Sequence, residues 1–358
     1  MYSRYCVRRA TTACGSTSTT ITASIPRPGA AVRASRQAPG GRPGYAGPSA
    51  TAASASMPPP PTATRPTSRS SRRRGVMSVK SEAAYIDHVA LDGERLHTAF
   101  ISGQGVPLLL CNDFVANLDI LNEFAAALGR PVLCFDLPGV GTSAEVVRMR
   151  RMPALAALLA KLLDHYGLRE PVDVMGIGWG GLLAQQFAHS QGDRVRRLVL
   201  AATASGQLMF PGRLASLVRL ARPGALSRVA PDGEQARTVF GGRRNDECRQ
   251  IATAMNRATA PTRRGYAAQI YALTGFSSLR WLHRLNVPTL VLAGDDDTIV
   301  PTVNSRVLAL LLPQARLEII RGGGHWFVLE RTDEVVRMLD EFLESKVAIS
   351  AADQNSTF

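Results

Sequence analysis

The stretch Val172-Asp173-Val174-Met175-Gly176-Ile177-Gly178-Trp179-Gly180-Gly181 has the pattern of a buried strand that leads through a tight turn into a helix. The largely apolar run 172–177 has the length of a strand that is covered on both faces. Gly176 and Gly180 suit a sharp reversal from strand to helix, because such a reversal leaves no room for Cβ atoms. The stretch therefore predicts a strand-to-helix turn that places Gly178 at its apex, at the carboxyl end of the strand.

The spacing of this turn is that of the G-x-S-x-G nucleophile elbow, whose apex serine attacks a carbonyl carbon. Here Gly178 stands where the serine would be. The same glycines, Gly176, Gly178 and Gly181, also fit the dinucleotide-binding pattern G-x-G-x-x-G. That alternative needs an early strand and an acidic residue closing the next strand, whereas this strand comes late and Asp193 precedes the next one. The spacing therefore favours the elbow.

Short apolar runs alternate with amphipathic helical patterns on both sides of the turn. The runs that we predict as strands are Ile86–Ala90, His97–Ile101, Pro107–Cys111, Pro131–Leu137, Val172–Ile177, Arg196–Ala202, Thr289–Gly294 and Leu317–Ile320. The first two suit an antiparallel pair, and near-continuous apolar strands separated by helices are typical of a parallel sheet. We expect an α/β fold: a mostly parallel eight-stranded sheet with helices on both faces and its site at the carboxyl ends of the strands.

The alternation stops between about residues 205 and 286. This interval holds helical patterns interrupted by Pro223-Gly224 and Gly241-Gly242, and it lies between two predicted strands. An insertion at that point of a parallel sheet would lie over the carboxyl edge of the strands. We therefore predict a helical lid over the site.

An acid and a histidine follow the turn in the order that an elbow-type hydrolytic triad requires. Asp297 comes shortly after a predicted strand, where a carboxylate can orient an imidazole, and Asp295 is the alternative acid. His325 follows the last strand in a glycine-rich loop. We expect His325 to bind Asp297 through one ring nitrogen and to direct the other toward Gly178, across the place of a serine hydroxyl. Three adjacent aspartates without further ligands predict no metal site.

The oxyanion-hole donors of such a site would be backbone N–H groups at Phe114 and Trp179. Asp113 complicates this expectation, because it places a carboxylate beside a site that would stabilise another negative charge. That arrangement is unfavourable unless the Asp113 side chain points away. Ser143 lies in a turn that we interpret as structural, so it does not replace the missing nucleophile.

Charge is distributed unevenly along the 358 residues. Residues 1–76 contain twelve arginines and no Asp, Glu or Lys, so this Arg-, Ser- and Pro-rich segment carries most of the net charge of +14. Such a composition predicts disorder. Three interpretations of the segment remain open: a targeting segment, an anchor to an anionic surface, or sequence translated from a start upstream of the true first residue, Met77.

We expect one domain at 77–348 and a flexible tail at 349–358. Because the domain is nearly neutral, its charge predicts no nucleic-acid binding.

The five cysteines show no metal-binding or disulfide spacing, and free thiols in a reducing compartment are expected. The first thirty residues lack the apolar core of a secretory signal, and the sequence has no apolar run long enough to span a membrane. We therefore expect a cytoplasmic protein, with association with a granule surface as an alternative. No oligomeric state is indicated.

With these residues in place, the chain resembles the α/β-hydrolase superfamily and, more closely, the intracellular depolymerases of medium-chain-length poly(3-hydroxyalkanoate). The similarity covers about residues 85–343 and is dense at Phe135–Gly141, Gly176–His189, Leu198–Ala204 and Trp281–Asp297. The resemblance implies hydrolysis of polymer or small 3-hydroxyacyl esters by a Ser-His-Asp triad that needs no cofactor. It also implies that Asp297 and His325 match the acid and the base.

Two departures from that family change the expected function. Gly178 replaces the nucleophile, and Asp113 and Val115 replace the glycines expected in the oxyanion loop. Ester hydrolysis is then expected to be lost or very weak. The alternative functions are a non-catalytic protein that binds 3-hydroxyacyl chains or polymer granules, and a cofactor-free activity of the histidine and acid alone.

Overall fold

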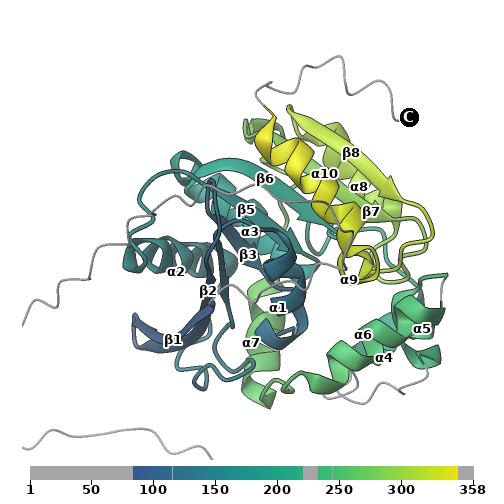
Figure 1. Cartoon of the computed structure of the whole chain (residues 1–358), viewed down its shortest axis with the longest axis horizontal. Coiled ribbons are helices and arrows are strands. Elements are labelled where there is room, and N and C mark those ends of the chain that lie inside the picture. Colours follow the sequence, from purple (N-terminus) through teal and green to yellow (C-terminus); the bar gives the residue numbers. More distant parts are fainter. Residues whose placement is uncertain (1–83, 115, 221–232, 244, 346–358) are drawn as a thin grey trace, which may run out of the picture. The chain divides into compact units, whose positions relative to one another are not determined.

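The strands of the structure form one eight-stranded sheet (Figure 1). The computed structural model describes residues 84–114, 116–220, 233–243 and 245–345, all within the unit Gly75–Phe358. The expected disorder of residues 1–76 and the expected tail at 349–358 lie outside the described residues. The strands are β1 (Ala84–Leu91), β2 (Glu94–Ile101), β3 (Leu108–Cys111), β4 (Val132–Phe135), β5 (Val172–Ile177), β6 (Val195–Ala201), β7 (Thr289–Gly294) and β8 (Ala315–Ile320).

The sheet order is β1-β2-β4-β3-β5-β6-β7-β8. β1 and β2 pair antiparallel around a turn whose residues Asp92 and Gly93 both have positive φ, and β2 pairs antiparallel with β4. All remaining neighbours are parallel. The predicted strands are thus confirmed, with end points that shift by a few residues. β5, which carries the glycine-rich turn, lies inside the sheet between β3 and β6.

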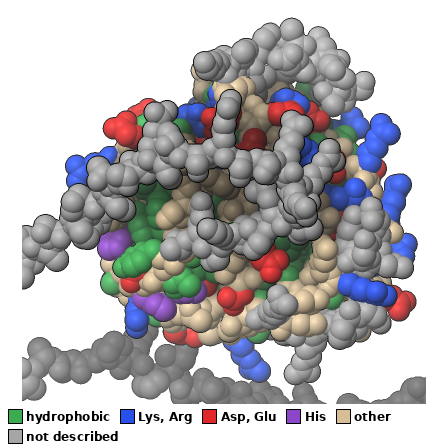
Figure 2. Space-filling view, in the orientation of Figure 1, with side chains coloured by type: hydrophobic (Ala, Val, Ile, Leu, Met, Phe, Trp, Pro, Cys, Tyr) green, Lys and Arg blue, Asp and Glu red, His purple; other side chains and the backbone are tan. Residues whose placement is uncertain are grey.

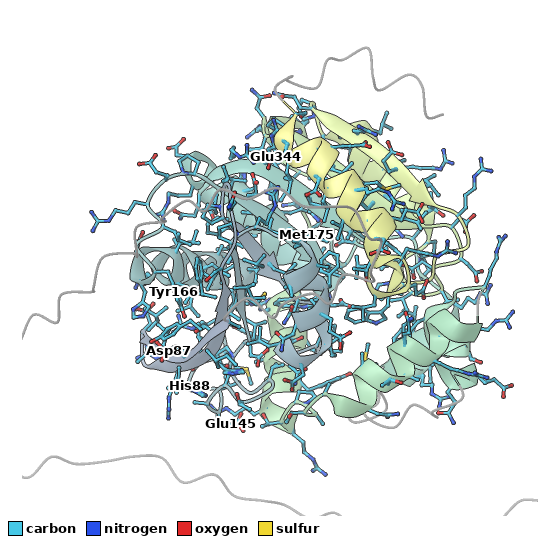
Figure 3. The ribbon with its side chains drawn as sticks, in the orientation of Figure 1. Asp87, His88, Glu145, Tyr166, Met175 and Glu344 are labelled. Carbon is cyan, nitrogen blue, oxygen red and sulfur yellow. The ribbon has the colours of Figure 1, made fainter. Side chains whose placement is uncertain are left out.

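Helices cover both faces of the sheet, as expected. One face packs against α1 (Leu118–Ala127) and α10 (Thr332–Glu344), and the other against α2 (Met152–His165), α3 (Trp179–Ser190) and α8 (Thr302–Leu311). Met175, labelled in Figure 3, is fully buried on the first of these faces.

The interval from β6 to β7 holds α4 (Leu214–Leu220), α5 (Glu234–Phe240), α6 (Asn245–Arg257) and α7 (Arg263–Leu273). Short segments complete the described elements: η1 (Gly192–Arg194), η2 (Leu282–Arg284) and α9 (Phe327–Glu330).

A buried carboxylate interrupts the apolar sequence of β5. Asp173 is fully buried and accepts hydrogen bonds from Arg196 at 2.6 and 2.8 Å and from Arg130 at 3.1 Å. Arg130 in turn donates to Glu344 at 2.8 Å, which ties α10 to the sheet. Because a buried charge is tolerated only when it is paired, these arginines explain how a strand with an aspartate in it can lie in the centre of the sheet.

Charges of both signs are interspersed over the described part of the surface shown in Figure 2. Among the described residues, no helix combines the length and the apolar character needed to cross a membrane.

The glycines of the elbow bring α3 into close contact with β3. A Cβ atom on Gly180 would lie 2.2 Å from the carbonyl oxygen of Cys111 and 2.3 Å from that of Asn112. A Cβ atom on Gly176 would lie 2.4 Å from the carbonyl oxygen of Gly180. The glycine spacing is therefore required by backbone contacts on both sides of position 178.

We predict that Gly180→Ala lowers the free energy of unfolding by about 1–3 kcal/mol, because the added methyl group overpacks a backbone contact. Gly192→Ala is the matched control, since a Cβ atom at Gly192 would meet nothing within 4 Å. Urea denaturation of both variants measures the effect. Equal, small changes in the two variants would show that the approach of α3 to β3 is not tight.

Candidate active site

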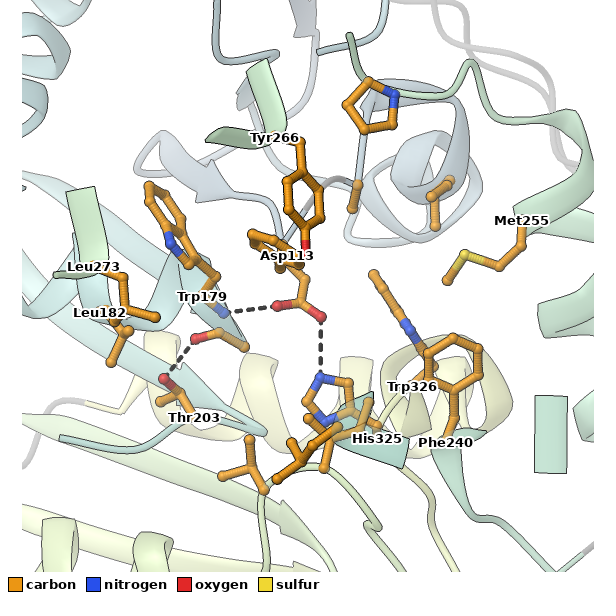
Figure 4. Close-up of a pocket in the computed structure, with 18 of the residues that line it drawn as sticks. Asp113, Trp179, Leu182, Thr203, Phe240, Met255, Tyr266, Leu273, His325 and Trp326 are labelled. Atoms are coloured by element: carbon orange, nitrogen blue, oxygen red, sulfur yellow. Dashed lines mark hydrogen bonds and ion pairs between the residues drawn. The ribbon is translucent and has the colours of Figure 1, made fainter. Parts of the chain in front are cut away.

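Gly178 holds the backbone geometry of a nucleophile elbow without a nucleophile. It precedes α3 with φ of 50° and ψ of −115°, angles that only glycine adopts without strain. Its N–H donates to the carbonyl of Ala201 at 2.9 Å, and its own carbonyl accepts from the Thr203 hydroxyl at 2.6 Å (Figure 4). The turn is thus fixed from the neighbouring strand β6. The sequence gives no signal for this role of Thr203, because its partner is a backbone atom.

His325 and Asp297 form the expected pair. The Nδ1 atom of His325 lies 2.7 Å from Oδ2 of Asp297, and both residues are buried. The other oxygen of Asp297 accepts the N–H groups of Ile299 and Val300 at 2.8 and 2.9 Å, which fixes the carboxylate. Asp295, the alternative acid, instead accepts the N–H of Gly322. The structure therefore places Asp297, and not Asp295, against the imidazole.

The second ring nitrogen of His325 faces a carboxylate. Its Nε2 atom lies 3.0 Å from Oδ2 of Asp113, and the other oxygen of Asp113 accepts the backbone N–H of Trp179 at 2.7 Å (Figure 4). We expected Nε2 to face Gly178 across the place of a serine hydroxyl, and that expectation is corrected here. The Asp113 carboxylate takes this place because an N–H donor and an imidazole both stabilise it there.

Asp113 and a side chain at position 178 exclude each other. A Cβ atom on Gly178 would lie 1.8 Å from Oδ1 and 2.3 Å from Cγ of Asp113. Contacts this short are forbidden for real atoms, so the aspartate can adopt its position only because residue 178 is glycine. Gly178 and Asp113 are therefore one coupled change of the site, rather than two independent defects.

The environment of His325 favours its charged form. Burial would lower the pKa of the ring, but the carboxylates of Asp297 and Asp113 outweigh burial and raise the pKa to about 10. An imidazolium between two carboxylates donates through both nitrogens. An imidazolium has no free lone pair with which to accept a proton from water or from an alcohol.

A largely apolar cavity of about 320 Å³ opens onto these groups. Its wall includes Asp113, His325 and Gly178 at one end, and it continues along side chains from the interval between β6 and β7, such as Phe240 and Met255. Figure 4 shows these side chains around the cavity. The volume lies within the usual range for a site that binds a small molecule.

The remaining predicted site residues also lie at this cavity. Phe114 lines it and packs edge-on against Tyr266, with ring centroids 5.1 Å apart. The side chain of Trp179 lines it as well and donates from Nε1 to the carbonyl of Gln269 at 3.2 Å. Val115 lies outside the described residues. The structure thus brings together Phe114, Trp179, Gly178, Asp297 and His325. It adds Asp113, which the sequence indicates only as an unfavourable neighbour of the oxyanion hole.

We predict that His325 makes stability depend on pH between about 6.5 and 10. Its folded-state pKa is raised from an ordinary 6.5, so its contribution is fully present below about pH 6.5 and is lost as the pH rises toward 10. The loss should be on the order of several kcal/mol. Urea denaturation of the wild type and of His325→Gln at several pH values isolates this contribution, because other titrating groups are common to both proteins. Parallel stability curves would show that the ring is not charged in the folded state.

Comparison with known proteins agrees with this architecture. The family described as alpha/beta hydrolase fold matches residues 106–332. A poly(3-hydroxyalkanoate) depolymerase from Ectopseudomonas oleovorans is 40% identical over 270 residues, which cover 72% of this chain and 92% of the relative.

Solved structures share the fold of this chain. An alpha/beta hydrolase fold protein from Chitinophaga pinensis has a TM-score of 0.63 at 22% identity and covers 74% of this chain and 99% of its own. A thermophilic esterase from Thermogutta terrifontis has a TM-score of 0.59 at 25% identity, with 73% and 98% covered. The chain therefore belongs to the α/β-hydrolase family and, within it, is similar to poly(3-hydroxyalkanoate) depolymerase.

Proposed function

We propose that this protein binds 3-hydroxyacyl esters, free or within a polymer, and that it hydrolyses them very weakly or not at all. The observation that carries the proposal is the position of Asp113, whose carboxylate fills the place of a serine side chain and holds the N–H of Trp179. The ligand class is taken from the similarity to poly(3-hydroxyalkanoate) depolymerase. The interval between β6 and β7 acts as the lid over the bound chain.

The chemistry of the site supports loss of hydrolysis in two ways. No serine hydroxyl is present at position 178 to form an acyl-enzyme. In addition, the Trp179 N–H, which would stabilise an oxyanion, already binds Asp113. The cavity can hold a ligand while Asp113 occupies the position of the attacking group. This combination suits a protein that binds an ester without cleaving it.

We predict that the single change Gly178→Ser yields a destabilised, inactive protein. The serine would adopt a φ of 50°, a strain of about 1–3 kcal/mol, and its Cβ atom would collide with Asp113. The double change Gly178→Ser with Asp113→Gly should recover at least about 1 kcal/mol through the relieved contact. It should also raise hydrolysis of p-nitrophenyl octanoate by orders of magnitude, with a burst of acyl-enzyme.

The Asp113→Gly single variant is the control for this cycle, because it frees the oxyanion-hole donor without supplying a nucleophile. Denaturation and single-turnover kinetics on the four proteins give the coupling. Hydrolysis by the wild type at the rate of the double variant would contradict the proposed function. Equal activity of Gly178→Ser and of the double variant would show that Asp113 does not block the site.

A second candidate function, binding to the surface of polymer granules, is favoured by exposed apolar side chains beside the cavity. Leu208 and Leu214 are 70% and 76% exposed, and Phe210 is 55% exposed. Leu208 and Phe210 flank Met209 in the sequence, and Leu214 begins α4; Met209 and Leu217 of α4 line the cavity. Large exposed apolar side chains that cluster next to a site mark a contact surface. In this function the protein would be cytoplasmic and associated with granules.

We predict that the double change Leu208→Ser with Leu214→Ser reduces co-sedimentation with medium-chain poly(3-hydroxyalkanoate) particles several-fold, because it removes apolar contact area. Leu310→Ser is the matched control, since Leu310 is also 70% exposed but lies on α8. Binding of a soluble ester should be unchanged in both variants. Unaltered co-sedimentation of the double variant would exclude this surface as the granule contact.

A further inference from the structure

Few charged side chains face the cavity. Among the described residues that line it, Asp113 and His325 are the charged ones, and neither lysine nor arginine is present. Asp297 lies directly behind His325 at 2.7 Å. Two carboxylates therefore act against one ring that carries at most a single positive charge, so this end of the cavity has a net negative charge.

The hydrogen-bonding groups at this end of the cavity are also reversed relative to a serine hydrolase. In a serine hydrolase the N–H at the position of Trp179 donates to the substrate oxygen and the histidine Nε2 accepts the proton of the serine. Here the Trp179 N–H and the Nε2 atom of His325 both face Asp113, at 2.7 and 3.0 Å. A carboxylate offers about four acceptor positions, and these two donors use two of them. Asp113 also lines the cavity. A ligand that reaches Gly178 thus meets an acceptor instead of donors.

A free carboxylate is a poor ligand for such a site. Its charge would lie beside Asp113 in an apolar cavity where no lysine or arginine of the described lining could pair with it. Like charges brought together without water are strongly unfavourable. A hydroxyl group has the opposite character, because it is uncharged and can donate a hydrogen bond to the carboxylate, an interaction stronger than one between neutral groups.

We propose that Asp113 is the specificity-determining residue of this cavity, accepting the hydroxyl group of an uncharged 3-hydroxyacyl ester and excluding the free 3-hydroxy acid. The inference rests on the acyl-binding function proposed above. It adds a direction to that function, since the protein would hold the intact ester and release the acid that a hydrolase produces.

Isothermal titration calorimetry of the wild-type protein with three eight-carbon ligands tests this inference. Methyl 3-hydroxyoctanoate should bind about tenfold more tightly than methyl octanoate, because only the former donates to Asp113. The 3-hydroxyoctanoate anion should bind at least about 100-fold more weakly than its methyl ester, because of the like charge. This comparison needs no variant.

Asp113→Asn then assigns the selectivity to one side chain. The amide keeps the shape of the carboxylate, removes its charge and can donate a hydrogen bond, so binding of the anion should rise at least about tenfold while the preference for the hydroxyl ester falls. Asp164→Asn removes a carboxylate that is 56% exposed on α2 and should change none of the three affinities. Circular dichroism checks that each variant is folded.

The outcomes separate this inference from the function on which it rests. Equal binding of the anion and the two esters by the wild type would overturn the selectivity and leave acyl binding intact. Unchanged selectivity in a folded Asp113→Asn protein would overturn the assignment to Asp113. Binding of none of the three ligands would overturn the acyl-binding function and this inference with it.

Discussion

The close approach of Asp113 to Gly178 is the constraint on which the site depends. A carboxylate oxygen lies where a Cβ atom of residue 178 would be, at 1.8 Å. Because no side chain fits at position 178 while Asp113 is in place, the glycine and the aspartate require each other. The position of the aspartate then determines the rest: it binds the Trp179 N–H and places a second carboxylate against His325.

The fold around this contact is that of an intact elbow. Gly178 has a left-handed φ of 50°, and Gly176 and Gly180 allow the backbone contacts that a sharp turn demands. His325 still binds Asp297, whose carboxylate is fixed by two backbone N–H groups. These contacts are present although position 178 carries no hydroxyl, because none of them involves a side chain at that position.

The sequence predicts the strands well and the site only in part. β5 and β7 have the predicted ends because apolar runs bounded by turns are local signals. The pairing of His325 with Asp297 follows from chain order along a known topology. The position of the Asp113 side chain could not be predicted from the sequence, because it depends on a hydrogen bond from the backbone of Trp179, 66 residues away in the chain. The available signal was the joint presence of an aspartate in the oxyanion loop and a glycine at the apex.

The same contact reverses the chemistry of the cavity. In a serine hydrolase the elbow offers N–H donors and a neutral base, which suit a carbonyl oxygen that becomes negative. Here the Trp179 N–H and the Nε2 atom of His325 face Asp113, and the raised pKa of His325, about 10, favours the charged ring. What remains for a ligand is an acceptor with negative charge inside an apolar wall. Stabilisation of a developing oxyanion and retention of this carboxylate are incompatible, so the site can serve one of them but not both.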